Sequence, residues 1–236
     1  MKPLKLNLTK ILILPGFLFL MFIQLAGCGD SGVVAPKSDD NVSISVKKDD
    51  GAFDNPVDVI VITEAKALIR EIEFELEGSG IEHEIHNAAF VVHFNLTGAV
   101  EVISAGKVPP GVYNKVKFQI HKPEDNETPP DPEFKEGTSG NQRYSFIIKG
   151  TYNGNSFVYK SRKSVNIVVN FNKPINLQEA GINLTMIINS VSWFKNGSIV
   201  LDPRDPDNDD LIDDNIKNSF KRAFRDDDKN GLPDDN

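Results

Sequence analysis

The feature that most constrains the fold is an alternation of apolar and polar residues with a period of two. In EIEFEL, residues 71–76, the apolar residues Ile72, Phe74 and Leu76 alternate with three glutamates. Successive side chains of a β-strand point to opposite faces of a sheet, so this pattern predicts a strand with one buried and one charged face. The alternation recurs at residues 90–96, 116–120 and 165–171.

Further strand candidates are spread over residues 57–201. They lie at residues 57–62, 100–103, 144–149, 156–159 and 183–194. Between two of them, Asn153 and Gly154 are residue types that tolerate the positive φ angles of a tight hairpin turn. Many short strands with one wet face each, and no long helical pattern, predict an all-β fold. We expect an antiparallel β-sandwich.

The N-terminus has the pattern of a secretory signal peptide. Lys2, Lys5 and Lys10 precede an almost wholly apolar run over residues 11–23. A membrane-spanning helix needs roughly 20 apolar residues, so this run is short for a span but suits the apolar core of a signal peptide.

The next residues are Leu25-Ala26-Gly27-Cys28. They resemble the lipobox of bacterial lipoproteins, where a peptidase cuts before the cysteine and a diacylglycerol is attached to its sulfur. Cys28 is the chain's one cysteine, which excludes an internal disulfide. The resemblance implies a signal peptide (1–27), a lipidated Cys28, and anchoring in the bacterial cell envelope, on the periplasmic or surface face. Residues 28–56 are rich in Asp, Ser, Gly and Lys and predict a tether, with one short strand candidate at residues 42–46. An incidental thiol in an uncleaved anchor is the alternative.

Two stretches of the middle region carry a second resemblance. VPPGVY, residues 108–113, fixes a turn before a strand, and IIKGTYNGNSFVYKS covers residues 147–161. Together they resemble a family of uncharacterised bacterial lipoproteins with a transthyretin-like or immunoglobulin-like β-sandwich. The resemblance implies a fold and a location for a 57–201 domain, and no chemistry.

Composition and motifs exclude several functions. The net charge is −8 and the pI is about 5.1, which argues against nucleic acid as a partner. The histidines His83 and His86 follow a His-Glu-x-His spacing, not the His-Glu-x-x-His of metalloproteases. Nucleophile-elbow and phosphate-loop motifs are absent from the sequence. We therefore expect a protein that is not an enzyme.

A long proline-rich stretch, HKPEDNETPPDPEFKEGTSGNQ, covers residues 121–142. A loop of this length is either functional or disordered, and its composition favours disorder. If the domain binds a protein partner, this loop is the first place to look.

The C-terminus contains an acidic repeat. Residues 205–215 and 226–236 align with a constant offset of 21 positions, conserving or exchanging most of their Asp and Asn. Oxygen ligands at positions 1, 3, 5 and 9, with a backbone carbonyl at 7, wrap calcium in a tight turn. Both segments therefore resemble the calcium loops of EF-hand, dockerin and thrombospondin type 3 repeats. The predicted ligands are Asp205, Asp207, Asp209, Leu211 and Asp213, then Asp226, Asp228, Asn230, Leu232 and Asp234.

Both segments depart from the EF-hand pattern at position 12. Ile216 replaces the bidentate glutamate in the first, and the sequence reaches only Asn236 in the second. Weak binding, as in extracellular modules, is therefore expected. Between the segments, residues 215–225 place Ile216, Phe220 and Phe224 on one helical stripe, which predicts a loop-helix-loop unit over 202–236. Asp213 could then cap the helix, and a solvated acidic tail remains the alternative to a calcium site.

The sequence thus predicts a lipid-anchored envelope protein with a non-catalytic β-sandwich and a calcium-binding repeat, acting as a structural or interaction module. The competing hypothesis is a glycan-binding or glycan-processing lipoprotein. It requires an exposed aromatic row, and its candidates are Tyr113, Tyr152, Tyr159 and Trp193. Burial of most of them would remove it.

Overall fold

The structure is a computed structural model that describes residues 37, 39–49, 59–85, 89–178 and 181–234. The predicted signal peptide and lipobox, Cys28 included, lie outside the described residues. The strands of the described residues are β1 (Val42–Lys48), β2 (Ile60–Leu76), β3 (Glu82–Glu84), β4 (Phe90–His93), β5 (Glu101–Gly106), β6 (Gly111–Ile120), β7 (Phe146–Tyr152), β8 (Asn155–Ser161), β9 (Val165–Leu177), β10 (Ile182–Ile188), β11 (Lys195–Asn196), β12 (Ile199–Val200) and β13 (Phe220–Arg225). One α-helix, α1 (Asp209–Asn218), is present among the described residues.

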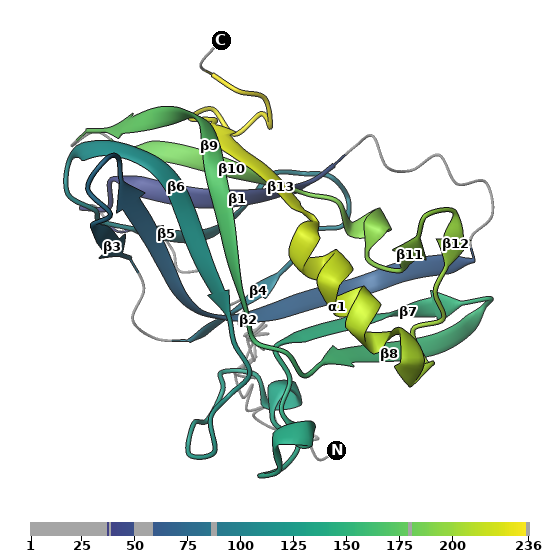
Figure 1. The fold of residues 1–236 in the computed structure, drawn as a ribbon. Helices are drawn as coiled ribbons and strands as arrows, with labels where there is room; N and C mark the ends of the chain where they lie inside the picture. The colour runs from purple at the N-terminus through teal and green to yellow at the C-terminus, as the bar shows by residue number, and fades with distance from the viewer. Residues whose placement is uncertain (1–36, 38, 50–58, 86–88, 179–180, 235–236) are drawn as a thin grey trace, which may run out of the picture.

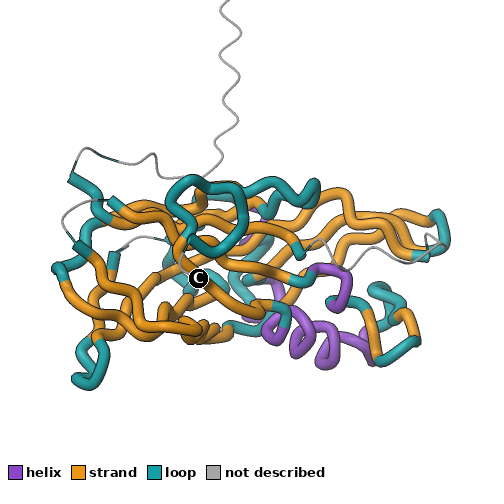
Figure 2. The backbone as a smooth tube through the Cα atoms, turned by 90° about the horizontal axis from the view of Figure 1, so that it is seen from above, coloured by secondary structure: helices purple, strands orange, loops and turns teal. Residues whose placement is uncertain are grey.

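The main sheet has eleven strands in the order β5-β1-β10-β13-β9-β6-β2-β7-β8, with β3 and β4 paired to β2. It curls into a half-barrel (Figures 1 and 2). Two pairs are parallel: β1 with β10 and β13 with β9. The mostly-β prediction is confirmed, but the main sheet is mixed and curled and is not plainly the antiparallel sandwich that was expected. Alternation along one strand does not say in which direction its neighbours run.

Strand β2 forms the spine of the curl. Its first half pairs with β7, for example Ala67 with Phe146, and its second half pairs with β6, for example Phe74 with Val116. The separate strands expected at 57–62 and 71–76 therefore belong in part to one continuous strand. Phe74 is fully buried, as the alternation in EIEFEL predicts.

The predicted hairpin turn is confirmed. Strands β7 and β8 are joined by Asn153 and Gly154, whose φ angles are 49° and 76°, and Tyr152 pairs with Asn155 across the turn. Positive φ at both central residues gives the turn the twist that antiparallel strands need.

The domain boundaries at residues 57 and 201 need correction. Strand β1 comes from the segment predicted as tether, yet it lies between β5 and β10. Strand β13 comes from the segment predicted as a separate calcium unit, yet it lies between β10 and β9, at the centre of the sheet. Residues 57–201 alone would leave both edges of β10 without a hydrogen-bonding neighbour.

The predicted helix over 215–225 is also wrong in its extent. Helix α1 begins at Asp209, and two aspartates in its first turn interact favourably with the helix dipole. It ends at Asn218, where Ser219 donates from both its backbone amide and its hydroxyl group to the carbonyl of Ile216. The chain then continues as β13, so the helix and strand share the segment that the sequence assigned to one helix.

Candidate metal site in the C-terminal acidic loop

The C-terminal acidic loop, residues 226–234, follows β13 directly. The carboxylates of Asp226, Asp228 and Asp234 each place an oxygen within 4.8 Å of the others, and they form the one such group of potential metal ligands in the described part of the chain. Asp226 is fully buried, whereas Asp228 and Asp234 are exposed. The loop lies at the top of the molecule in Figure 1, beyond the end of β13.

The buried carboxylate of Asp226 is held by three donors. Its Oδ1 accepts a hydrogen bond from the amide of Asn230 at 2.9 Å. Its Oδ2 accepts from the amide of Gly231 at 3.0 Å and from the hydroxyl group of Thr185 at 2.6 Å. A buried carboxylate needs such donors because they replace its lost hydration. Asp226 therefore fixes both the shape of the loop and its position on the sheet.

The rest of the loop curls around the same space. Lys229 and Gly231 have φ angles of 57° and 82°, the left-handed conformation that glycine adopts without strain. A glycine therefore stands at one of the two residues of the loop where the backbone is left-handed. The amide of Asp234 donates to the carbonyl of Arg225 at 3.0 Å, and the amide of Asp227 donates to the Asp234 carboxylate, which closes the loop.

A polar network connects the loop to two strands. The side-chain amide of Asn183, on β10, donates to the carbonyl of Asp226 at 2.9 Å and to the hydroxyl group of Thr185 at 3.1 Å. Its Oδ1 accepts from Ser43 and Ser45 on β1, both at 2.8 Å. None of these four residues was predicted from the sequence. Each alternates with apolar residues of its strand, which is also the pattern of an ordinary solvent-exposed strand face.

The ligand set of the second predicted loop is thus partly assembled. Carboxylate and carbonyl oxygens are the ligands that Ca²⁺ prefers. Asn230 lies in the loop, where its Oδ1 accepts from the amide of Leu232 at 2.7 Å and its Nδ2 donates to Asp228 at 2.8 Å. A carbonyl oxygen has two lone pairs, so Asn230 could also hold a cation beside the three carboxylates.

The first predicted loop is not a loop in the structure. Asp205 accepts from the amide of Asp207 at 3.1 Å and caps a 3₁₀ turn, Pro206–Asn208. The next residue begins α1, and a helix directs the side chains of Asp209 and Asp213 along its own surface. The carboxylates of this segment and the carbonyl of Leu211 are therefore not gathered around one point.

Asp213 has a different partner. It is buried in α1, where its Oδ1 accepts from the hydroxyl group of Tyr159 on β8 at 2.7 Å. Burial raises the pKa of the Asp213 carboxyl, although hydrogen bonds from Ser161 and Tyr159 oppose this. Burial and the neighbouring Asp213 also raise the pKa of Tyr159. Asp213 therefore connects α1 to β8 by a buried hydrogen bond. It is neither the predicted helix cap nor a metal ligand in a loop.

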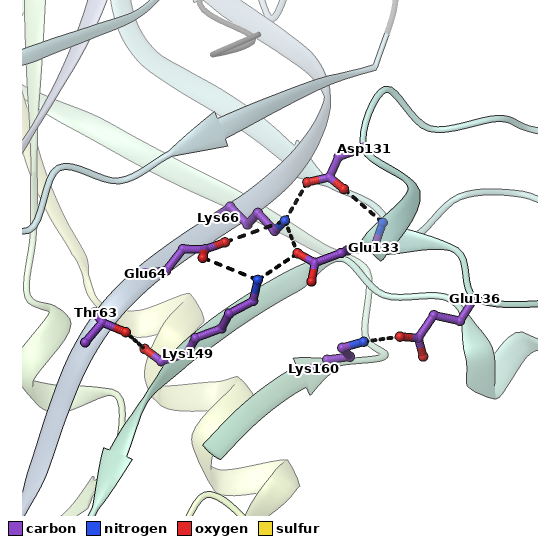
Figure 3. Close-up of polar contacts among 8 residues, drawn as sticks. All are labelled: Thr63, Glu64, Lys66, Asp131, Glu133, Glu136, Lys149 and Lys160. Carbon is purple, nitrogen blue, oxygen red and sulfur yellow. Dashed lines mark hydrogen bonds and ion pairs between the residues drawn. The ribbon is translucent and has the colours of Figure 1, made fainter. Parts of the chain in front are cut away.

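A second charged cluster, which was not predicted from the sequence, surrounds Lys66 on β2 (Figure 3). The buried Lys66 ammonium is 2.5 Å from an Asp131 oxygen and also contacts Glu133, which Lys149 reaches at 2.9 Å. Burial acts to lower the pKa of Lys66, but the hydrogen bonds to the two carboxylates outweigh it, and the pKa is raised. Hydrogen bonds from Lys66 and Lys149 lower the pKa of Glu133 to about 2.

This cluster corrects the expectation of disorder for residues 121–142. The segment contains 3₁₀ turns at Pro132–Phe134 and Gly140–Gln142. Phe134 is fully buried in a small cluster with Leu68 and Tyr144. Ion pairs to β2 and one buried aromatic ring therefore hold the segment against the sheet, which its proline-rich composition alone did not reveal.

The aromatic row required for glycan binding does not form. Tyr113 and Trp193 are fully buried, and Tyr159 is 3% exposed. Tyr152 is half-buried, with the guanidinium group of Arg204 5.2 Å from its ring centroid. Three of the four rings are therefore buried in the core and offer no stacking face for a sugar.

Comparisons with known proteins are sparse. Neither a protein-family model nor a curated protein matches the sequence. Among solved structures, the fold is similar to MbnP from Methylosinus trichosporium, with a TM-score of 0.42 and 10% identity over 71% of this chain and 85% of that one. A likeness this remote carries no argument about function. No helix in the described ranges is long and apolar enough to cross a membrane.

Proposed function

We propose that the protein is a lipid-anchored, non-catalytic component of the bacterial cell envelope whose C-terminal acidic loop binds one calcium ion. The observation that carries the calcium assignment is the convergence of Asp226, Asp228 and Asp234 within 4.8 Å. The proposal keeps the second predicted loop and gives up the first, since residues 205–213 are largely helical.

Electrostatics support a cation at this position. Two unit charges 4.8 Å apart repel by about 1 kcal/mol in water and by about 3–4 kcal/mol at the effective dielectric constant near a protein surface. Three converging carboxylates therefore oppose the closed form of the loop, and a divalent ion reverses the sign of that interaction. With few protein ligands, we expect a Kd on the order of 10⁻⁴–10⁻³ M, which suits an extracellular concentration of calcium.

Calcium in this loop would have a structural role. Asp226 bonds to Thr185 on β10, and the backbone of the loop joins β13, the next strand in the sheet. An ion that binds only the closed loop would stabilise the docking of the C-terminus on the sheet. At a calcium concentration of ten times Kd, the free energy of unfolding would rise by about 1.4 kcal/mol.

The membrane anchor is proposed from Leu25-Ala26-Gly27-Cys28 alone. Several acyl chains on one cysteine hold a protein firmly, because each buried methylene contributes about 0.8 kcal/mol. Mass spectrometry of the membrane-extracted protein should find acyl groups on Cys28. A Cys28→Ser variant recovered in the membrane fraction as fully as the parent would refute the anchor.

Calorimetric titration with calcium tests the metal assignment. The chain from residue 29 onward should bind one calcium ion, and Asp228→Asn should weaken binding at least tenfold. Asp207→Asn is the matched control, because Asp207 is an exposed aspartate of the first acidic segment and should bind nothing. This site would be excluded if calorimetry detected no heat of binding up to several millimolar calcium. It would also be excluded if the Asp228→Asn variant bound calcium with unchanged affinity.

A further inference from the structure

Three further side chains of types that bind metals lie at the opposite end of the molecule, in a looser arrangement than the carboxylates of the acidic loop. His121 follows β6 directly and begins the segment that Figure 1 shows at the bottom of the view, far from the C-terminal acidic loop. His121 is 7% exposed, and its Nε2 is completely buried without a hydrogen-bond partner. A buried nitrogen in this state is rare in folded proteins and requires an explanation.

The Nε2 atom points at two carboxylates. It is 3.6 Å from Glu124 Oε1 and 3.6 Å from Glu127 Oε2. These separations are too long for hydrogen bonds. They are close to the separation of two ligands that share one ion, because zinc bonds of 2.0–2.2 Å at tetrahedral angles place nitrogen and oxygen roughly 3.3–3.5 Å apart.

The turn that carries the carboxylates is fixed without using the imidazole. The ammonium group of Lys135 donates to the backbone carbonyls of Glu124, Asp125 and Glu127 at 3.2, 2.7 and 2.6 Å. The amide of Glu124 donates to Glu127 Oε2 at 3.0 Å. The ligand-bearing turn is therefore held in place before any ion arrives, which reduces the entropy that binding must overcome.

The two carboxylates differ in their exposure to solvent. The Glu124 side chain is 60% exposed and the Glu127 side chain 27%, so the site opens to water on one side.

We propose that His121, Glu124 and Glu127 bind a divalent transition metal of the zinc class. Imidazole combined with carboxylate selects such metals over calcium, and three protein ligands leave one tetrahedral position for water. The three ligand atoms do not all lie within 4.8 Å of one another. Binding therefore requires the exposed Glu124 side chain to rotate inward. This site is independent of the calcium site.

Competition with a zinc-chelating dye, together with the visible absorption of bound Co²⁺, tests the proposal. Both are measured in the Asp228→Asn background, so that the acidic loop does not contribute. The Asp228→Asn protein, which is the parent in this experiment, should bind one metal ion, and its Co²⁺ complex should have the absorption spectrum of a tetrahedral site. His121→Gln should lose affinity by more than the roughly 10–100-fold that removal of an outer-shell partner costs.

His93→Gln is the matched control, because His93 is exposed on β4 and should not affect binding. Glu124→Gln provides a second test in case His121→Gln disturbs folding, since Glu124 is largely exposed. It should weaken binding at least tenfold while the circular dichroism spectrum stays unchanged. The proposal would be overturned if the parent failed to bind Zn²⁺ or Co²⁺. It would also be overturned if the His121→Gln and Glu124→Gln variants bound the metal as tightly as the parent does.

Discussion

The hydroxyl group of Thr185 donates a 2.6 Å hydrogen bond to the buried carboxylate of Asp226, 41 residues further along the chain. Thr185 lies on β10, a strand whose side chains are all buried. The bond places the proposed calcium loop against the centre of the sheet. The loop is therefore an extension of the fold, and its stability and metal affinity should change together.

Thr185→Val should destabilise the protein even without calcium. The substitution keeps the shape but removes a donor to the buried Asp226 carboxylate and an acceptor for the side-chain amide of Asn183. An unsatisfied buried polar group costs about 1–3 kcal/mol. Urea denaturation in the presence of a chelator should show this loss. Thr63→Val is the control: Thr63 is exposed, and its substitution should change the free energy of unfolding by less than about 0.5 kcal/mol.

Deletion of residues 219–236 should unfold the protein. It removes β13, which leaves β10 paired only with β1, and β9 paired only with β6. Circular dichroism and urea denaturation should show loss of the cooperative transition. Substituting both Asp228 and Asp234 by Asn, which removes charge and keeps the strand, should preserve it. A cooperative transition of ordinary size in the deletion variant would show that the C-terminus is dispensable.

The strands could largely be predicted from sequence, but their pairing could not. Period-two alternation identifies β2, β6 and β9, because one face of each is buried. Alternation says nothing about which neighbour a strand pairs with, so the parallel contacts of β1 and β13 were missed. Those contacts depend on segments far apart in the chain.

The helix boundary failed for a local reason. Ile216, Phe220 and Phe224 are four residues apart, a spacing that fits one stripe of a helix. Four is also a multiple of two, so the same spacing fits one face of a strand. The signal that separates the two states is Ser219, whose hydroxyl group binds the carbonyl of Ile216 at 2.6 Å and ends the helix.

The two acidic segments show how much a motif can establish. Their spacing of aspartates is nearly identical, yet residues 205–213 are mainly helical and residues 226–234 form a loop. Gly231 has a left-handed backbone conformation that suits a tight loop, whereas Asp210, 21 positions earlier, lies in the first turn of α1. The glycine was therefore the informative residue of the repeat.

Glu133→Gln should destabilise the protein at pH 7 but not near pH 2. Hydrogen bonds from Lys66 and Lys149 lower the pKa of Glu133 from 4.5 to about 2. A lowered folded-state pKa contributes stability above pH 4.5, and that contribution is lost as the pH falls through 2. The difference in unfolding free energy between parent and variant should therefore shrink over this range. A difference that stays constant with pH would contradict the ion-pair assignment, and the exposed Glu77→Gln should show no difference at either pH.

Gly231→Ala should weaken calcium binding. The φ angle of Gly231 is 82°, which costs a residue with a Cβ about 1–2 kcal/mol, and an added Cβ would lie 2.6 Å from Lys47 Cδ. Gly80→Ala is the control, because Gly80 has a φ angle of 66° with nothing within 4 Å of an added Cβ. Both variants should be less stable, but calorimetry should find reduced calcium affinity only in Gly231→Ala. Equal calcium affinity in both variants would contradict the prediction.

A crystal structure of the chain from residue 29 onward, grown in 10 mM calcium, tests the central claim most directly. The account predicts one ion bound by Asp226, Asp228 and Asp234, with oxygen distances of about 2.3–2.6 Å, while residues 205–213 bind none. Density for water alone between these three carboxylates, or a calcium ion bound instead at residues 205–213, would contradict it.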